Sequence, residues 1–445
     1  MRLNKLTIKN LRLYGEDEQT LYFAPDKNIT VLLGDNGAGK TSLLYGATVL
    51  LSQFLSVFPG SQRKTFVKED VRNVNNETRA DYVHVGIDLV PTCSENDENI
   101  PFDIINNKNH VEADMYVKGN MVRNAPESKL KSIKDYANIL KEKIDNLETV
   151  ALPIVAFYGT ERGHIKPVER RRDFKDVFPR WDIYKSDALE SVTDFKRFFT
   201  WYERNEDLER RERERLWDRN YTSHVLDAVR RALEIFFDHL RNPRVETGPL
   251  RFVMDDITNP SNPIETRIER MSDGYRISVA LIADIAARLA EANPTLEGSG
   301  IEDPLNANGI VLIDEIDLHL HPRLQREILR RLSDIFPNVQ FIVSTHSPNV
   351  ILGALELVQV VKLNHGLIDS NINTSQYEKY DVSLVLLSDL FDIDNVRTKE
   401  FKDIEKEEDE LLSKDSLTND ELNRLKEIAL QLSLYGYSDG EERRR

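Results

Sequence analysis

A glycine-rich loop between an apolar strand and a helix constrains the fold of this chain most. Residues 34–41 read Gly-Asp-Asn-Gly-Ala-Gly-Lys-Thr and fit the pattern G-x-x-x-x-G-K-[ST]. The apolar run 29–33 predicts a buried strand, and residues 42–51 predict the helix that follows the loop. Glycines allow backbone N–H groups to surround phosphate oxygens at a helix N-terminus. We therefore expect the chain to bind a nucleoside triphosphate.

The residues of this loop have separate expected roles. Lys40 is expected to contact the β- and γ-phosphates and to act in catalysis, and the Thr41 hydroxyl is expected to bind Mg²⁺. ATP and Mg²⁺ are therefore the expected cofactors. The alternative, an ordinary glycine-rich turn, is disfavoured because every fixed position of the motif is present. The expected nucleotide-binding residues of the loop are Gly34, Asn36, Gly37, Ala38, Gly39, Lys40, Thr41 and Ser42.

A pair of acidic residues downstream supplies a second motif. Residues 310–313, Ile-Val-Leu-Ile, predict a buried strand, and Asp314 and Glu315 follow directly. An apolar strand followed by two acids is the Walker B pattern. Asp314 is expected to hold magnesium, and Glu315 is expected to polarise the attacking water. A purely structural acid pair is the alternative, which the complete upstream loop disfavours.

Three histidines downstream of this motif are candidates for a functional role. His346 comes after the predicted strand 339–344, and the carboxyl end of a parallel strand is where ligands bind. It is therefore a candidate for sensing the γ-phosphate or orienting water in catalysis, with a structural role as the alternative. His319 and His321 flank a turn beside Asp317. They are interpreted as structural or interface residues, because two ligands do not make a metal site.

A further segment discriminates between classes of P-loop protein. Residues 271–276 read Met-Ser-Asp-Gly-Tyr-Arg and precede a predicted apolar helix over 277–289. The segment resembles the signature loop of ABC-class ATPases, usually L-S-x-G-x, with Met in place of Leu. The resemblance implies that Ser272, Asp273 and Gly274 cap the nucleotide bound by a second subunit, and that Asp317 lies in a D-loop. The smallest active unit would then be a homodimer, which could build a higher homo-oligomer.

The order of the motifs along the chain also resembles the ABC class. The strand pair before the P-loop is similar to the SMC/RecF/OLD side of that class. Residues 312–322 and 344–348 look most like the ATPase subunits of Septu-type anti-phage systems, whose partner is an HNH nuclease. One departure concerns the loop 159–162, Gly-Thr-Glu-Arg, where the class carries a glutamine. The resemblance leaves open which residue replaces it.

The predicted fold class is α/β. We expect an ABC-type P-loop ATPase with a mixed central sheet, N-terminal antiparallel strands, a helical insert and a C-terminal helical segment. Strands are expected over 2–10 and 81–90, a loop with short strands over 93–109, a helix over 128–147, and a helical block between the strand 152–158 and Met271. The aromatic residues of that block are expected to form its core and not a base-stacking surface: Trp181, Phe198, Phe199, Trp201, Tyr202, Trp217, Phe236 and Phe237. The expected divisions are 1–163 for the first part of the core, 164–245 for the helical insert, 246–375 for the second part of the core and 376–445 for the acidic C-terminal segment.

Composition and charge limit the classes of protein. The chain has 31% charged residues and a single cysteine, Cys93, which fits a reducing cytoplasm. No apolar run is long enough to span a bilayer, so no membrane association is expected. The net charge of −16 disfavours nucleic-acid binding over the whole surface. Residues 389–421 carry thirteen acidic and five basic residues, whereas 162–185 carry eight basic and four acidic. DNA contacts are therefore expected only through a partner or this basic segment.

Three functions remain open at this point. The first is an ATP-hydrolysing switch subunit that regulates a separate HNH-type nuclease in anti-phage defence. The second is a RecF/SMC-like DNA-repair or DNA-clamping ATPase that binds DNA directly. The third, a transporter's nucleotide-binding subunit, is the least favoured because no glutamine loop or membrane-coupling helix is recognisable. Net charge favours the switch over the clamp.

Overall fold

The computed structural model divides the chain into two compact units, residues 1–379 and 380–445. The structure describes residues 1–75, 78–91, 110–118, 123–124, 128–163, 180–189, 195–247, 250–294, 302–370, 372–391, 399–414 and 418–434. The predicted loop at 93–109 and most of the basic segment 162–185 lie outside these ranges.

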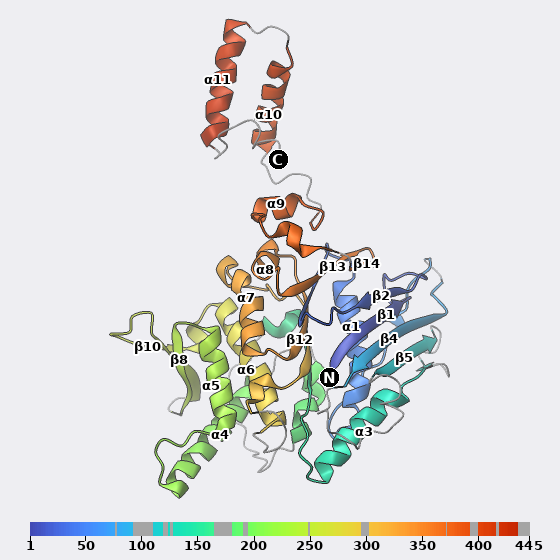
Figure 1. Cartoon of the computed structure of the whole chain (residues 1–445), viewed down its shortest axis with the longest axis vertical. Helices are drawn as coiled ribbons and strands as arrows, with labels where there is room; N and C mark the ends of the chain where they lie inside the picture. Colours follow the sequence, from blue (N-terminus) through green and yellow to red (C-terminus); the bar gives the residue numbers. More distant parts are fainter. Residues whose placement is uncertain are drawn as a thin grey trace. The chain divides into compact units, whose positions relative to one another are not determined.

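A six-stranded mixed sheet forms the centre of the first unit (Figure 1). Its order is β14-β13-β3-β12-β11-β7, and all neighbours are parallel except β14 and β13. These strands span Ile29–Leu33 (β3), Ile154–Tyr158 (β7), Gly309–Ile313 (β11), Val339–Ser344 (β12), Val358–Asn364 (β13) and Leu367–Asp369 (β14). Strands β3, β11 and β12 are buried along their whole length, as their mainly apolar sequences predict. Because β3, β11 and β12 are adjacent and parallel, the P-loop, Walker B pair and His346 follow the same edge of the sheet.

A second sheet of antiparallel strands has the order β2-β1-β4-β5-β6. The strands span Arg2–Lys9 (β1), Gln19–Tyr22 (β2), Tyr82–Val90 (β4), Val111–Lys118 (β5) and Arg123–Asn124 (β6). The pairing of β1 with β2 and the strand at 81–90 confirm the predictions for this region. Helix α3 (Lys131–Asp145) packs on β5 through the apolar face that predicted it.

Helix α1 (Lys40–Leu55) begins at the P-loop and contacts strands of both sheets, among them β4 and β12. Its sequence is apolar all round, and nearly every residue of the helix is buried. Helices α6 (Asp273–Ala292), α7 (Pro322–Ile335) and α8 (Pro348–Leu352) follow the signature segment, the Walker B turn and His346. The α/β fold with a mixed central sheet is therefore as predicted.

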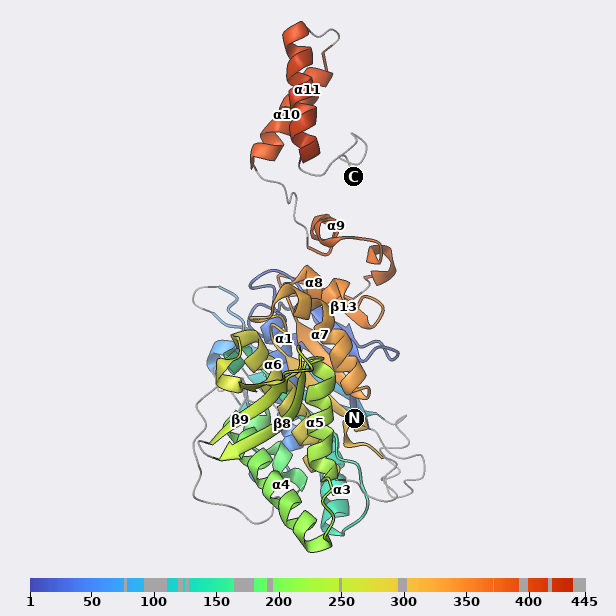
Figure 2. The same ribbon diagram turned by 90° about the vertical axis from the view of Figure 1, so that its left-hand side faces the viewer.

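The region between β7 and α6 is not wholly helical, and here the prediction was wrong. Helices α4 (Phe195–Leu216) and α5 (His224–Phe236) form a hairpin, which Figure 2 shows in front. They are followed by a three-stranded antiparallel sheet of β8 (Leu240–Thr247), β9 (Leu250–Asp256) and β10 (Ile264–Arg267). Charged residues of these strands pair across neighbouring strands, as Arg244 does with Asp255 at 2.8 Å and with Glu265 at 3.1 Å.

Aromatic side chains fill the interior of this region, as expected, with one exception. Phe198, Tyr202 and Phe252 pack together in edge-to-face and tilted arrangements. Trp217, expected in the same core, is 94% exposed at the end of α4 and has a left-handed φ of 52°. The prediction grouped Trp217 with the aromatic residues of the helical block, but helix α4 ends at Leu216, so Trp217 is not on the buried face of that helix.

The second unit contains helices α9 (Val382–Leu387), α10 (Lys399–Leu412) and α11 (Asn419–Leu434). Leu411 and Ile428 are buried, and Ile404 and Leu425 pack against them, so α10 and α11 share a small apolar core. An ion pair between Arg424 and Glu407, at 2.8 Å, also joins the two helices. Within the described ranges, every helix of the protein is too short or too polar to span a bilayer.

Candidate ATP site

The P-loop follows β3 and contains three glycines with positive φ. Gly34, Gly37 and Gly39 have φ values of 147°, 81° and 113°, in the region that disfavours side chains. A Cβ on Gly34 would collide with the carbonyl oxygen of Leu363, and one on Gly39 would lie 2.9 Å from the Tyr14 hydroxyl. The loop is therefore held close to its neighbours, with its backbone open for phosphate oxygens.

Lys40 and Thr41 occupy the first turn of α1. The Lys40 side chain donates to the carbonyl oxygens of Gly34 at 2.6 Å and Asp35 at 2.9 Å, so its ammonium group lies over the loop. Burial lowers the pKa of Lys40, and the nearby carboxylates of Asp314 and Glu315 oppose this shift. Thr41 Oγ1 donates to Asp314 Oδ2 at 2.7 Å. The two oxygens that are expected to bind magnesium therefore lie side by side. Oxygen atoms are the ligands that Mg²⁺ prefers.

Asp314 and Glu315 follow β11, and the adjacent strand β12 fixes both. Ser344 Oγ donates to Asp314 Oδ1 at 2.5 Å and accepts from the Glu315 backbone N–H at 2.7 Å. Glu315 itself has a φ of 50°, a left-handed conformation that is strained for a residue with a Cβ. Ser344 was missed in the sequence. The only signal was its place at the end of the strand next to Walker B.

These residues line one cavity of about 130 Å³. Glu315 and His346 line this cavity together with residues of the P-loop. The structure therefore brings the predicted catalytic acid and the predicted catalytic histidine close to the loop. Leu13 also lines the cavity, and neighbouring Tyr14 donates to the Gly39 carbonyl at 3.1 Å. The predicted residues that line it are Asn36, Gly37, Gly39, Lys40, Thr41, Ser42, Asp314, Glu315 and His346. Gly34 and Ala38 belong to the same loop without lining the cavity.

The signature segment lies elsewhere in the unit. Ser272 is exposed and directly precedes α6, Asp273 begins that helix, and Gly274 is buried. A Cβ on Gly274 would lie 2.5 Å from the His319 carbonyl oxygen, so the glycine allows close contact with the turn after Walker B. Asp317 accepts a hydrogen bond from Thr345 Oγ1 and does not line the P-loop cavity. Within one chain, the signature and P-loop residues are therefore not brought together.

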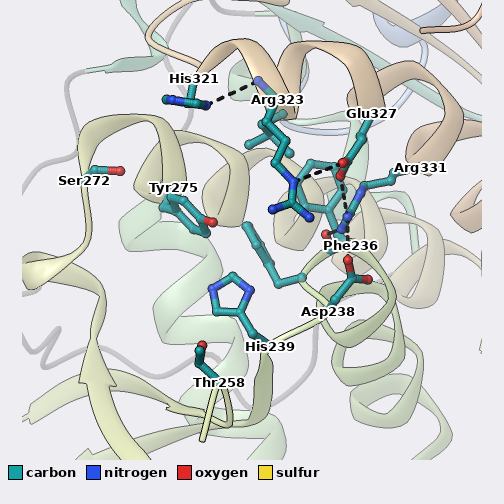
Figure 3. A pocket seen from close by; sticks show the side chains of 12 residues that line it. Phe236, Asp238, His239, Thr258, Ser272, Tyr275, His321, Arg323, Glu327 and Arg331 are labelled. Atoms are coloured by element: carbon teal, nitrogen blue, oxygen red, sulfur yellow. Dashed lines mark hydrogen bonds and ion pairs between the residues drawn. The ribbon is translucent and has the colours of Figure 1, made fainter.

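Ser272 instead borders a larger cavity of about 510 Å³ (Figure 3). Tyr275, His239 and His321 surround this cavity, and Tyr275 stacks on Phe237. His321 Nδ1 caps α7 by accepting from the Arg323 N–H at 3.3 Å. This capping supports the structural interpretation of His321. Within the described ranges, no group of three or more His, Cys, Asp or Glu residues could hold a metal ion.

Comparison with known families agrees with this geometry. An AAA domain model matches residues 5–233, which is just over half of the chain and includes the P-loop. The chain belongs to the AAA domain family. A second AAA domain model, whose description names the AbiEii toxin and type IV toxin–antitoxin systems, matches residues 164–353. The matches together include the P-loop, Walker B and signature residues, and this AAA domain protein is an ATPase.

Individual relatives of this AAA domain ATPase include a retron ATPase and a Septu protein. The Retron Vc95 probable ATPase of Vibrio cholerae serotype O1 biovar El Tor is 28% identical over 78% of this chain and 71% of its own length. The Septu protein PtuA of Bacillus mycoides strain KBAB4 is 41% identical over a shorter stretch, 20% of this chain and 12% of its own length. The SMC head domain from Thermotoga maritima aligns with 84% of this chain and 100% of its own, at 16% identity and a TM-score of 0.45.

Proposed function

We propose that this ATPase is the nucleotide-dependent switch subunit of an anti-phage defence system and that it regulates a separate, HNH-type nuclease. The observation that carries the proposal is the convergence of the P-loop, Asp314, Glu315 and His346 on one cavity, in a chain similar to retron and Septu ATPases. A switch requires two states that differ in affinity for a partner, and ATP binding and hydrolysis supply them.

The residues of the cavity divide the work of hydrolysis. Lys40 and the loop N–H groups would bind the phosphates, and Thr41 and Asp314 would hold Mg²⁺, which neutralises charge on the β- and γ-phosphates. Glu315 would accept a proton from the attacking water. His346, which lines the same cavity, would orient that water or respond to loss of the γ-phosphate.

We propose a homodimer as the smallest hydrolysing unit. Ser272 and the P-loop line different cavities of one chain, and Ser272 is exposed. A second copy can present its own Ser272, Asp273 and Gly274 to the nucleotide held by the first. The hydroxyl, the backbone N–H and the N-terminus of α6 would then stabilise the γ-phosphate across the interface.

A mixing experiment tests this arrangement. Ser272→Arg and Lys40→Ala proteins are each expected to be inactive, because one lacks the signature hydroxyl and the other lacks the phosphate-binding ammonium. A mixture forms dimers with one intact P-loop facing one intact signature, so part of the ATPase activity should return when subunits exchange. Phosphate release before and after mixing measures this. Full activity in a preparation shown by light scattering to be monomeric would contradict the dimer model.

The acidic second unit is the proposed nuclease-binding segment. Leu412 and Leu422 lie outside the core that joins α10 and α11, and their side chains are 54% and 43% exposed, so a partner could cover them. An alternative is that these helices serve only their own subunit. Deleting residues 389–445 is expected to leave ATP affinity unchanged but to abolish co-purification of the nuclease and protection against phage. Retained co-purification by the truncated protein would exclude this segment as the binding site.

The full-length protein, purified without a partner, tests whether this chain cuts DNA itself. The purified protein, free of any partner, is expected to leave DNA intact in Mg²⁺, because the proposed magnesium-binding carboxylate serves ATP hydrolysis. Degradation that persists in Asp314→Ala would reveal a separate nuclease centre and would contradict the switch proposal. A DNA clamp of RecF/SMC type would instead bind duplex DNA directly, with affinity that falls steeply as salt rises.

A further inference from the structure

Arg162 follows β7 in the short 3₁₀ turn Thr160–Gly163, where the ABC class carries its glutamine. The side chain is only 1% exposed and is among the largest fully buried side chains of the described residues. It does not line the P-loop cavity. The guanidinium therefore contacts the backbone of the Walker B residues without lining the cavity itself.

The guanidinium contacts backbone carbonyls at the ends of two neighbouring strands. Arg162 Nη1 donates to the carbonyl oxygens of Gly159 at 2.9 Å and Asp314 at 2.5 Å, and Nη2 donates to the carbonyl oxygen of Glu315. Gly159 follows β7, and Asp314 and Glu315 follow β11, which pairs with β7 in parallel register. A planar group with fixed N–H directions thus joins the two strand ends.

The residue held in this way is the one with the strained backbone. Glu315 has a φ of 50°, and such a conformation persists only where the surroundings enforce it. Ser344 Oγ accepts from the Glu315 N–H at 2.7 Å, while Arg162 donates to the Glu315 carbonyl oxygen. The peptide groups on both sides of the Glu315 Cα are therefore fixed, by β12 on one side and by the 3₁₀ turn on the other.

We infer that Arg162 is a positioning residue for ATP hydrolysis: it replaces the glutamine loop by holding the backbone of Glu315 so that its carboxylate faces the attacking water. This inference rests on the role proposed above for Glu315. Burial lowers the pKa of Arg162 to about 10, and the carboxylates of Asp314, Asp317 and Glu315 oppose that shift, so the guanidinium remains charged at neutral pH. Displacement of a catalytic group by about 1 Å can cost about 100-fold in rate.

Two substitutions test the geometry of the guanidinium. Arg162→Lys keeps the charge but cannot reach carbonyls on both strands with one nitrogen, and Arg162→Met keeps the volume without any donor. We expect kcat to fall about 10-fold or more in the lysine variant and about 100-fold in the methionine variant. The KM for ATP should stay within about threefold, because Arg162 does not contact the P-loop.

Arg288 provides a matched control. Its side chain is 4% exposed on α6, with hydrogen bonds to Asp284 Oδ2 at 2.8 Å and to the Ile183 carbonyl at 2.7 Å. Arg288→Lys should lower the melting temperature without a selective loss of kcat. If both Arg162 variants lose the folded state, or if their kcat falls no more than that of an Arg288→Lys protein with the same loss of melting temperature, then Arg162 is a structural residue and the inference is overturned.

A double-mutant cycle separates this inference from the role of Glu315. If Arg162 acts through Glu315, then adding Arg162→Lys to Glu315→Gln should slow single-turnover hydrolysis no further than Glu315→Gln alone. Multiplying effects would overturn the inference and leave the proposed function intact. If Glu315→Gln alone hydrolyses ATP at the unsubstituted rate, the role of Glu315 fails and the inference fails with it.

Discussion

Replacing Lys40 with alanine should weaken ATP binding by about 100-fold or more. The Lys40 ammonium lies over the P-loop, within hydrogen-bond distance of the Gly34 and Asp35 carbonyl oxygens, where phosphate oxygens would compete for it. Hydrogen bonds to a charged group contribute about 1.5–3 kcal/mol each. Loss of two such contacts to the β- and γ-phosphates therefore removes about 3 kcal/mol or more, and each 1.4 kcal/mol is tenfold in affinity. Calorimetric titration with a non-hydrolysable ATP analogue measures the change.

The fold should survive this substitution. The Asp35 carbonyl keeps the Ala38 N–H as a partner at 3.0 Å, and the other contacts of α1 do not involve the Lys40 ammonium. Lys143→Ala removes a buried lysine from a different helix, α3, and controls for the loss of a buried lysine as such. Normal ATP affinity in Lys40→Ala would contradict the assignment of the phosphate site.

Glu315→Gln should bind ATP with unchanged affinity and hydrolyse it about 100-fold more slowly or worse. Glutamine has nearly the same shape, and the backbone bonds of Glu315 to Ser344 and Arg162 do not depend on its carboxylate. What is lost is the proton acceptor for the attacking water, and general-base catalysis contributes about 10²–10⁴-fold. Single-turnover phosphate release gives the rate, and calorimetry gives the affinity.

A distant carboxylate controls for the change of charge. Glu356, about half exposed, pairs with Arg330 away from the cavity, so Glu356→Gln should hydrolyse ATP at the normal rate. The slow Glu315→Gln protein should also accumulate as an ATP-bound dimer, because ATP binding forms the dimer and the hydrolysis that would let it dissociate is slow. Weakened ATP binding in Glu315→Gln, at a normal turnover rate, would assign Glu315 to binding and not to catalysis.

Local sequence was sufficient for the elements around the nucleotide. In β3, β11 and β12 apolar residues occupy both faces of the strand, whereas a half-exposed strand alternates apolar and polar residues. Their burial could therefore be predicted. The glycines of residues 34–39 indicated the left-handed turns of the P-loop, because few other residues adopt them. Composition misled for β8–β10, since strands stabilised by cross-strand ion pairs lack the apolar alternation by which strands are recognised.

The sequence by itself therefore determined the α/β class, the phosphate loop, the acidic pair and the order of the motifs, because each of these is written in neighbouring residues. Only the tertiary structure decided which distant residues meet. Ser344 bonds to Asp314 across two strands, and Arg162 reaches Glu315 from a turn about 150 positions earlier in the chain. No local pattern encodes these contacts, because they depend on the register of parallel strands, which is fixed by packing of the whole sheet.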